Sequence, residues 1–542
     1  MEGQAVAHGK KMTPQPSRDE PYELPEGWVW AAIADLVVDA QPGFACGKKG
    51  IEGGIRHLRM NNIGPDCRLN LSQVTRVPSH LARERHLLKP GDVLFCHTNS
   101  QKLVGKTALF DIQDGSYAYS NHLTRLRLPS NGPPPRWLSY ILATLWRDRY
   151  FETRCKQWVN QATVERATLL STPIPVGPLK EQQRVVAKIE GLFQQSRTAR
   201  EGLDRIPPLL KKFRQSVLAA AFRGDLTRDW REQNPDIEPA SVLLEHIRAE
   251  RRRKWEDTLR AKGKDPRKAK YKEPAPVDHN GLENLPEGWE YTTVSEVGSL
   301  NDDPVLTGPF GAQLPSKEFV LEGVPVIAIG NVMWGNLRLE KVDHVTPEKA
   351  LELSRYTLQP GDVLFTRSGT VGRSTVIPEY GKGWLMSYHL LRVRVEKSVC
   401  DPAYLYFVFR GLLTIQDQIT ETARGATRPG FNTLLLKQLR LPLPPVQEQQ
   451  RVVLRIEELF ACADAIEAAV KAAYRHAGRL EQSILTRAFR GGLVPQDPND
   501  EPASVLLARI RTEREKGGDA KRRMIDGRRE KKRQGAKGMA NV

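Results

Sequence analysis

The amino-acid sequence contains a long internal duplication. Residues 181–193 read EQQRVVAKIEGLF and residues 448–460 read EQQRVVLRIEELF, a separation of 448 − 181 = 267 residues. A unit of this length is far too long for a solenoid repeat, so we predict two copies of a module that contains several elements. Further phrases recur in the same order in both halves: LPEGW (from Leu24 and Leu285), PGDVLF (Pro90 and Pro360), AFRG (Ala221 and Ala488) and EPASVLL (Glu238 and Glu501).

Each copy of the module has a globular front and a helical back. The fronts are rich in Gly, Pro and short β-type runs such as GDVLF and STVIP, with one expected helix each, which predicts a compact α+β domain. The backs predict long helices. The expected order is a disordered N-terminal tail (1–20), a first globular domain (21–178), a first long helix (179–224), a basic linker (225–284), a second globular domain (285–445), a second long helix (446–492) and a C-terminal segment whose basic end is disordered (493–542).

The two long helices share a heptad pattern. In the first helix, apolar or small residues recur in alternating steps of four and three from Val185 to Val217, and the second helix repeats the pattern from Val452 to Ile484. This spacing predicts that the helices pair with each other as an antiparallel coiled coil, related by a pseudo-twofold axis. The alternative is that each helix packs only on its own globular domain. The Pro207-Pro208 pair predicts a kink in the first helix.

The composition favours a polyanionic partner. Lys and Arg number 82 against 64 Asp and Glu, a net charge of +18. A charge of this sign and size favours nucleic acid, although two basic tails on a neutral body would produce the same number. The six cysteines form no CxxC pair and have no His at zinc-ligand spacing, so neither a zinc site nor a disulfide framework is expected. No apolar stretch of about 18 residues occurs, so we expect no membrane span and a cytoplasmic location.

The repeated phrases together resemble those of the specificity subunit of type I restriction–modification enzymes. The match rests on LPEGW, PGDVLF, the proline-rich junction into EQQRVV (173–186 and 442–453) and AFRG, each present twice, and it covers about residues 21–510. The resemblance implies that each globular domain is a target-recognition domain that reads one half of a split DNA sequence. It also implies that the paired helices set the distance between the halves, and that terminal segments close the two halves into a ring.

The same resemblance implies a non-catalytic subunit that works through partners. The expected partners are double-stranded DNA, two methyltransferase subunits that methylate adenine and two motor-nuclease subunits. S-adenosylmethionine, ATP and magnesium would be used by those partners, and no cofactor is expected in this chain. The sequence agrees, since we find no NPPY-like motif and no GxxxxGK[ST], and GFACGKKG from Gly43 falls short of the latter. The competing interpretations are a protein scaffold and an enzyme, such as a nuclease.

Candidate DNA-binding residues lie in polar loops between the apolar runs. Arg, Lys, Asn and Gln are the side chains that read base edges, and small polar or basic groups contact phosphates. The first domain offers Lys48, Lys49, Arg59, Asn61, Asn62, His97, Thr98, Asn99, Ser100, Gln101, Lys102, Asn121, Lys156, Gln157, Asn160 and Gln161. The second domain offers Gln313, Lys317, Asn331, Thr366, Arg367, Ser368, Thr370, Arg373, Tyr388, Arg424, Thr427 and Arg428.

The two sets of loops match in position and differ in residue identity, which predicts an asymmetric target. A single Asn or Gln in a loop is also a common turn residue. For His122 and His389 a structural hydrogen bond is the competing role. We expect Trp158 and Trp334 to be half-buried packing residues, with insertion at a base step as the alternative. The basic run 248–272 is expected to be a solvated linker helix, with phosphate contact or partner docking as its alternative.

Overall fold

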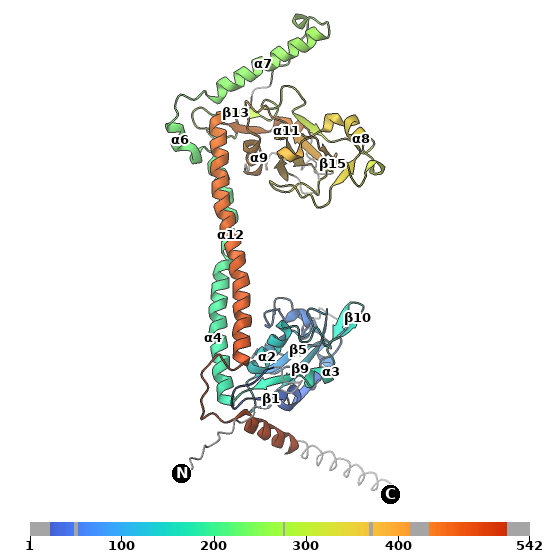
Figure 1. The fold of residues 1–542 in the computed structure, drawn as a ribbon, viewed down its shortest axis with the longest axis vertical. Helices are drawn as coiled ribbons and strands as arrows, with labels where there is room; N and C mark the ends of the chain where they lie inside the picture. The colour runs from blue at the N-terminus through green and yellow to red at the C-terminus, as the bar shows by residue number, and fades with distance from the viewer. Residues whose placement is uncertain (1–21, 48–51, 275–276, 368–371, 412–432, 517–542) are drawn as a thin grey trace, which may run out of the picture. The chain divides into compact units, whose positions relative to one another are not determined.

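The computed structural model describes residues 22–47, 52–274, 277–367, 372–411 and 433–516 (Figure 1). The chain divides into two compact units: unit 1 consists of Met1–Gly202 and Ala472–Val542, and unit 2 consists of Leu203–Lys471. Residues 1–20 and 517–542, which include most of the segment expected to be disordered, lie outside the described ranges. Residues 503–516, just before the C-terminal range, form a helical stretch. No helix within these ranges is both long and apolar enough to span a membrane.

Unit 1 contains a mixed helix-and-strand domain built on a four-stranded antiparallel sheet. The order in this sheet is β2-β9-β5-β7, and helix α2 packs against β5 and β7. A three-stranded sheet β4-β3-β8, a second one β10-β11-β6 and the pair β1-β12 complete the domain. The bounds are β1 Val29–Ala32, α1 Ile33–Leu36, β2 Asp39–Pro42, β3 Ile55–Leu58, β4 Thr75–Val77, β5 Asp92–Cys96, β6 Thr98–Asn99, β7 Thr107–Phe110, β8 Tyr117–Tyr119, β9 Leu123–Arg127, α2 Pro135–Arg147, β10 Lys156–Trp158, β11 Gln161–Thr163, α3 Arg166–Leu170 and β12 Pro173–Val176.

Unit 2 repeats this domain with the same strand orders. Its four-stranded sheet β14-β20-β17-β18 corresponds to β2-β9-β5-β7, its sheet β16-β15-β19 corresponds to β4-β3-β8, and β13 pairs with β21 as β1 pairs with β12. The predicted α+β architecture is confirmed. The bounds are β13 Glu290–Thr293, β14 Val305–Thr307, β15 Val324–Ile327, β16 Asp343–Val345, α8 Pro347–Glu352, β17 Val363–Thr366, β18 Ser374–Val376, β19 Leu385–Met386, β20 Leu390–Val393, α9 Pro402–Gly411, α11 Thr433–Gln438 and β21 Arg440–Leu443.

The repeated PGDVLF phrase forms the turn into the central strand of each sheet. The buried Asp92 carboxylate accepts a hydrogen bond from a backbone N–H of this turn at 2.7 Å and pairs with both arms of the Arg127 guanidinium, at 2.6 and 2.7 Å. Asp362 and Arg394 form the same two-armed pair in unit 2, at 2.7 Å for each arm. A two-armed Arg–carboxylate pair fixes the orientation of both side chains, which explains why the phrase recurs together with an arginine on the neighbouring strand.

The first long helix is interrupted where the prolines predict it. One residue, Arg205, separates helix α4 (Leu179–Asp204) from helix α5 (Ile206–Phe222). Pro207 and Pro208 lie in the first turn of α5. Proline is tolerated in a first turn because its missing N–H would have no partner there. The second copy is one continuous helix, α12 (Val446–Phe489), of 44 residues.

The predicted heptad seam is buried or half-buried at most of its positions. Val185, Ile189 and Val217 are buried, as are their counterparts at the ends of α12, and so are Leu210 and Val470 further along the seam. The prediction is wrong at single positions, since Phe213 is 39% exposed, Ile466 41% and Leu480 48%. Spacing alone therefore located the helices correctly and did not predict which seam positions are exposed.

A polar cluster replaces apolar packing next to Leu480. In unit 1 the buried Glu481 carboxylate accepts a hydrogen bond from Ser196 at 3.0 Å and pairs with Arg200 at 3.2 Å and with Arg147 of α2 at 3.7 Å. Leu480 points to solvent because its neighbour Glu481 takes the inward position. A buried carboxylate with several donors accepts only one alignment of its partners, so this cluster specifies the register of α4 against the last part of α12.

The contacts within each unit run in opposite chain directions. In unit 1, the first residues of α4 share a core with the last residues of α12. In unit 2, the last residues of α5 share a core with the first residues of α12, and Arg214 pairs with Asp464 and Glu467. Each unit therefore contains helical segments from both copies of the module.

One hydrogen bond joins each globular domain to the start of its own helix. The indole of Trp28, from LPEGW, donates to Glu181, from EQQRVV, at 2.9 Å. Trp289 donates to Glu448 at 2.8 Å in the second copy. These bonds are buried, and they explain why the two phrases recur as a pair.

The two glutamates have different further partners. The second carboxylate oxygen of Glu448 accepts hydrogen bonds from Thr227 at 2.7 Å and from Arg231 at 2.9 Å. The corresponding oxygen of Glu181 has no hydrogen-bond partner among the described residues. Burial raises the pKa of Glu181 above its ordinary value of 4.5, against the opposing effects of the Trp28 hydrogen bond and of Arg184.

Each EPASVLL phrase packs on the globular domain of the other copy of the module: the first on the second domain, and the second on the first domain. The backbone N–H of Ala240, at the start of α7 (Ala240–Ala261), donates to the carbonyl of Gly288 at 2.9 Å in unit 2. In unit 1, Ala503 donates to Gly27 at the same distance. Leu506, Leu507 and Ile510 of the helical stretch 503–516 join the core of unit 1, as Leu244 and Ile247 of α7 join the core of unit 2.

We expect opposite effects from removing the charge of the two buried glutamates. Glu181→Gln keeps an acceptor for Trp28 and removes a carboxylate whose charged form is disfavoured. Because the folded-state pKa of Glu181 is raised, its charge opposes folding increasingly as the pH rises above about 4.5. Glu181→Gln should therefore raise the thermal midpoint of unfolding at pH 7, and the gain should shrink toward pH 5.

Glu448→Gln is the matched control. It leaves the half-buried Arg231 beside a neutral amide, so it should destabilise unit 2 by about 1–3 kcal/mol at pH 7. Calorimetry of the full-length variants between pH 5 and 8 measures both effects. Equal losses in both variants would contradict the different roles assigned here.

Candidate nucleic-acid interface

Two of the predicted polar loops of unit 1 form one small sheet. Strand β6 follows the buried strand β5 and pairs with β11, which pairs with β10, with Asn99 opposite Ala162 and Thr98 opposite Thr163. The hydroxyls of Thr98 and Thr163 lie 3.2 Å apart. The loop at 97–102 and the hairpin at 156–161 therefore make one continuous surface, a pairing that the sequence did not predict.

The tip of the β10–β11 hairpin exposes large apolar side chains. Trp158 is 69% exposed and Val159 is 93% exposed. The prediction that Trp158 is a half-buried packing residue is wrong, because every residue of β10 lies at the surface and the hairpin is held by edge pairing with β6. Trp334 in unit 2 is also exposed, at 42%, so the half-buried position expected for it is wrong as well. Four polar residues around the tip are also exposed: Lys156, Gln157, Asn160 and Gln161.

His97 is a neutral hydrogen-bonding group in this surface. Its Nδ1 lies 2.9 Å from the Thr124 hydroxyl. Burial lowers the pKa of His97 to about 4, and the neighbouring His122 adds to this effect. His97 is therefore uncharged at pH 7 and offers no positive charge to a phosphate.

The rest of this loop is more accessible. The Asn99 side chain accepts a hydrogen bond from the backbone N–H of Ser100 at 2.8 Å, which shapes the turn. Gln101 donates to the Glu152 carbonyl at 3.4 Å. Exposed candidates in and beside the loop are Ser100, Gln101, Lys102 and Asn121, with Asn61 exposed and Arg59 half-buried on the loop after β3.

Asn62 and Asn331 close loops, and their interpretation as base-reading residues is wrong. They are 2% and 4% exposed. In both, the amide oxygen accepts a backbone N–H at 2.8 Å. Both amide nitrogens donate to two backbone carbonyls, at 2.9 and 3.0 Å from Asn62 and at 2.8 Å from Asn331. Their recurrence at equivalent positions in loops that otherwise differ was the signal of a structural role.

Unit 2 keeps the backbone of this site and changes its side chains. The backbone N–H of Arg367 donates to the carbonyl of His389 at 3.1 Å, as His97 donates to His122 at 3.1 Å in unit 1. The Arg367 guanidinium donates to Thr307 at 3.1 Å. A cationic arginine thus stands where unit 1 has a neutral histidine, which is the kind of difference that an asymmetric target requires.

The other candidates of unit 2 divide into buried and accessible residues. Thr366 is fully buried at the end of β17, so its interpretation as a DNA contact is wrong. Arg373 is half-buried, with its Nη1 3.7 Å from the Met333 sulfur. Tyr388 is 39% exposed with its ring centroid 3.7 Å from that of His389. Gln313 and Lys317 are exposed.

Seven candidates lie outside the described residues. They are Lys48, Lys49, Ser368, Thr370, Arg424, Thr427 and Arg428. Within the described ranges, no group of three or more His, Cys, Asp or Glu side chains is arranged to hold a metal ion. The site that the structure does describe can therefore offer hydrogen bonds, positive charge and an aromatic face.

Comparisons with known proteins agree with the resemblance found in the repeated phrases. Residues 286–473 match the family model described as "Type I restriction modification DNA specificity domain". The EcoKI specificity subunit of Escherichia coli strain K12 is 27% identical over 92% of this chain and 98% of its own length. The EcoBI specificity subunit of Escherichia coli is 27% identical over 65% of this chain and 67% of its own length.

Solved structures show the same fold. A chain from a study of assembly and conformational transition in a type I R-M system aligns with a TM-score of 0.61 and 19% identity, over 87% of this chain and all of that chain. The HsdS subunit from Thermoanaerobacter tengcongensis aligns with a TM-score of 0.50 and 18% identity, over 87% of this chain and 99% of that chain. With the family model and the specificity subunits above, these findings show that the chain is similar, over most of its length, to the specificity subunits of type I restriction enzymes and shares the fold of solved type I R-M chains.

Proposed function

We propose that this chain recognises a two-part, asymmetric DNA target, with one half read by each unit. The observation that carries the proposal is the surface formed by β6, β10 and β11 in unit 1, together with the change from His97 to Arg367 at the equivalent position after the central strand in unit 2. The buried sheets and their Arg–Asp pairs are the same in both units, while the residues at the strand ends differ. Loops on a constant scaffold are where recognition residues are expected to vary.

The chain is proposed to act through partner subunits. Two methyltransferase subunits would methylate adenine with S-adenosylmethionine, and two motor-nuclease subunits would use ATP and magnesium for restriction. The similarity to proteins named as specificity subunits of type I restriction enzymes supports this division of labour.

The long helices are proposed to pair as an antiparallel coiled coil that sets the distance between the half-sites. Support comes from the opposite chain directions of the helical contacts inside each unit and from the buried Glu481 cluster, which specifies register. The rival proposal is a protein scaffold whose positive charge is incidental. The exposed tryptophan at a hairpin flanked by polar and basic residues favours DNA, because such combinations are used to contact nucleic-acid bases.

Methylation mapping tests the function directly. The chain would be co-expressed with a type I methyltransferase subunit from the same genome in a host without DNA methylation, and modified adenines would be located by single-molecule sequencing. We expect a two-part motif with a fixed gap and adenine methylation on both strands. Normal assembly without new methylation would favour the scaffold proposal.

Trp158→Ala should weaken recognition of one half-site. Stacking of a base on an aromatic side chain is worth about 1–3 kcal/mol, so affinity for the mapped target should fall about 5- to 150-fold. Trp158→Phe should retain most of it. Binding is measured by fluorescence anisotropy with targets altered in one half at a time.

Tyr380→Ala in unit 2 is the matched control, since Tyr380 is 65% exposed and lies outside the candidate loops. It should leave affinity unchanged. Loss of discrimination at both half-sites in Trp158→Ala, or an equal effect of Tyr380→Ala, would contradict the assignment of one half-site to each unit.

A further inference from the structure

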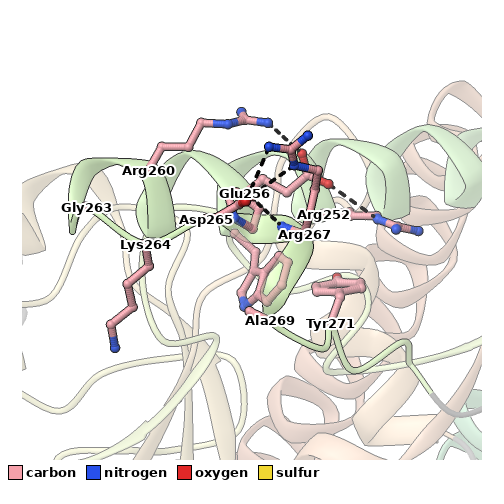
Figure 2. A pocket seen from close by; sticks show the side chains of 11 residues that line it. Arg252, Glu256, Arg260, Gly263, Lys264, Asp265, Arg267, Ala269 and Tyr271 are labelled. Carbon is pink, nitrogen blue, oxygen red and sulfur yellow. Dashed lines mark hydrogen bonds and ion pairs between the residues drawn. The ribbon is translucent and has the colours of Figure 1, made fainter.

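The basic run of the linker folds into a defined hook. We call residues 252–272 the basic hook: the last part of helix α7 and the segment that returns along it (Figure 2). The rings of Trp255 and Tyr271 lie 5.1 Å apart, and the Arg252 guanidinium lies over the Tyr271 ring at 5.9 Å. Arg252 also pairs with Glu273 at 3.3 Å. Basic residues from two segments are thereby held on one surface.

The helix that carries the hook is fixed to the globular domain of unit 2. Arg248 pairs with the buried Glu296 at 2.7 Å, and Arg251 donates to the carbonyls of Glu296 and Gly298 at 3.1 and 2.9 Å. Lys254 donates to Asn301 at 2.8 Å. The expectation of a linker helix with solvated charges on all sides is therefore wrong for the start of this run.

The hook carries an excess of uncompensated positive charge. Residues 248–274 contain 12 Lys and Arg and 5 Asp and Glu, so their net charge is 12 − 5 = +7. Arg252, Arg260 and Arg267 have carboxylate partners. Six further basic residues are exposed and have no ion pair in the described part of the chain: Arg253, Lys262, Lys264, Lys268, Lys270 and Lys272.

An open, polar pocket lies within the hook. Its volume is about 670 Å³, and its wall includes Arg252, Arg260, Lys264 and Arg267 (Figure 2). Trp255 and Tyr271 also line the pocket, where their half-buried rings are tilted by 57° to each other. None of the large apolar side chains that unit 2 exposes lies in residues 252–272.

We propose that the basic hook binds the sugar–phosphate backbone of duplex DNA, independently of base sequence. The surface suits phosphate better than protein, because protein interfaces are depleted in lysine and are centred on apolar anchors, which the hook lacks. Lysine and arginine side chains are the usual phosphate ligands. The inference rests on the proposed function and adds to it an anchoring site distinct from the loops proposed to read bases.

The test removes four of the free charges in the full-length protein: Lys264→Ala, Lys268→Ala, Lys270→Ala and Lys272→Ala together. Each phosphate contact contributes about 0.9 to the slope of log affinity against log salt. If two of the four lysines contact phosphate, the slope falls by about 2 and Kd at 0.1 M salt rises at least 10-fold. The loss should be equal on target and non-target duplexes, so the specificity ratio stays unchanged.

The matched control removes four exposed lysines elsewhere in unit 2: Lys211→Ala, Lys212→Ala, Lys382→Ala and Lys397→Ala together. It makes the same change in net charge and should lower affinity much less. Unchanged binding of the hook variant, or equal losses in both variants, would overturn the inference.

A hydroxyl-radical footprint adds a second readout. The hook variant should lose protection at backbone positions outside the mapped motif and keep protection within it. If the unmodified chain shows no preference for the mapped target, the proposed function fails. If it shows that preference and the hook variant behaves like the unmodified chain, only the phosphate-binding role of the hook fails.

Discussion

The architecture depends on a buried hydrogen bond between a tryptophan at the start of each globular domain and a glutamate at the start of each long helix. Trp28 with Glu181, and Trp289 with Glu448, connect the first strand of a domain to the helix that follows its last strand. Such a bond is directional, and a buried indole N–H left without an acceptor would cost about 1–3 kcal/mol. It sets the angle at which the helix leaves the domain, and every contact further along the helix depends on that angle.

Because the module is duplicated, equivalent residues of its two copies can be compared within one chain. Features present in both copies, such as the Arg127–Asp92 and Arg394–Asp362 pairs, belong to the scaffold. Features that differ at equivalent positions, such as neutral His97 against cationic Arg367, are free to serve recognition. The EPASVLL segments also show the value of this comparison, since Arg514 donates to the backbone of unit 1 at 2.7 Å and its counterpart Arg251 does the same in unit 2.

The sequence predicted the parts of the fold that depend on local pattern. Heptad spacing located the long helices, the Pro207-Pro208 pair located the break between α4 and α5, and short β-type runs predicted the sheets. It failed where the outcome depends on distant partners. Whether Leu480 or Glu481 turns inward depends on Arg147 and Arg200, which lie hundreds of residues away in the sequence.

In the candidate site, too, the sequence predicted the features that depend on local pattern and failed where distant residues decide the outcome. Polar loops after buried strands were identifiable, and most of the described candidates are exposed or half-buried there. Asn62 was misassigned because loop closure and base reading use the same amide group. Trp158 was misassigned because a large aromatic residue is usually buried, and its exposure depends on a hairpin that pairs with β6 through residues about sixty positions earlier in the chain.

The way the units are composed has a consequence for synthesis on the ribosome. Unit 2 is a continuous stretch, Leu203–Lys471, so all its core residues are available once that stretch has emerged. Unit 1 includes the first globular domain and also Leu506, Leu507 and Ile510, which follow the whole of unit 2 in the sequence. The core of unit 1 can therefore be completed only after unit 2 has been synthesised, the reverse of the usual N-to-C order of domain folding. Loss of these three residues would leave the core of unit 1 unfinished and the core of unit 2 intact.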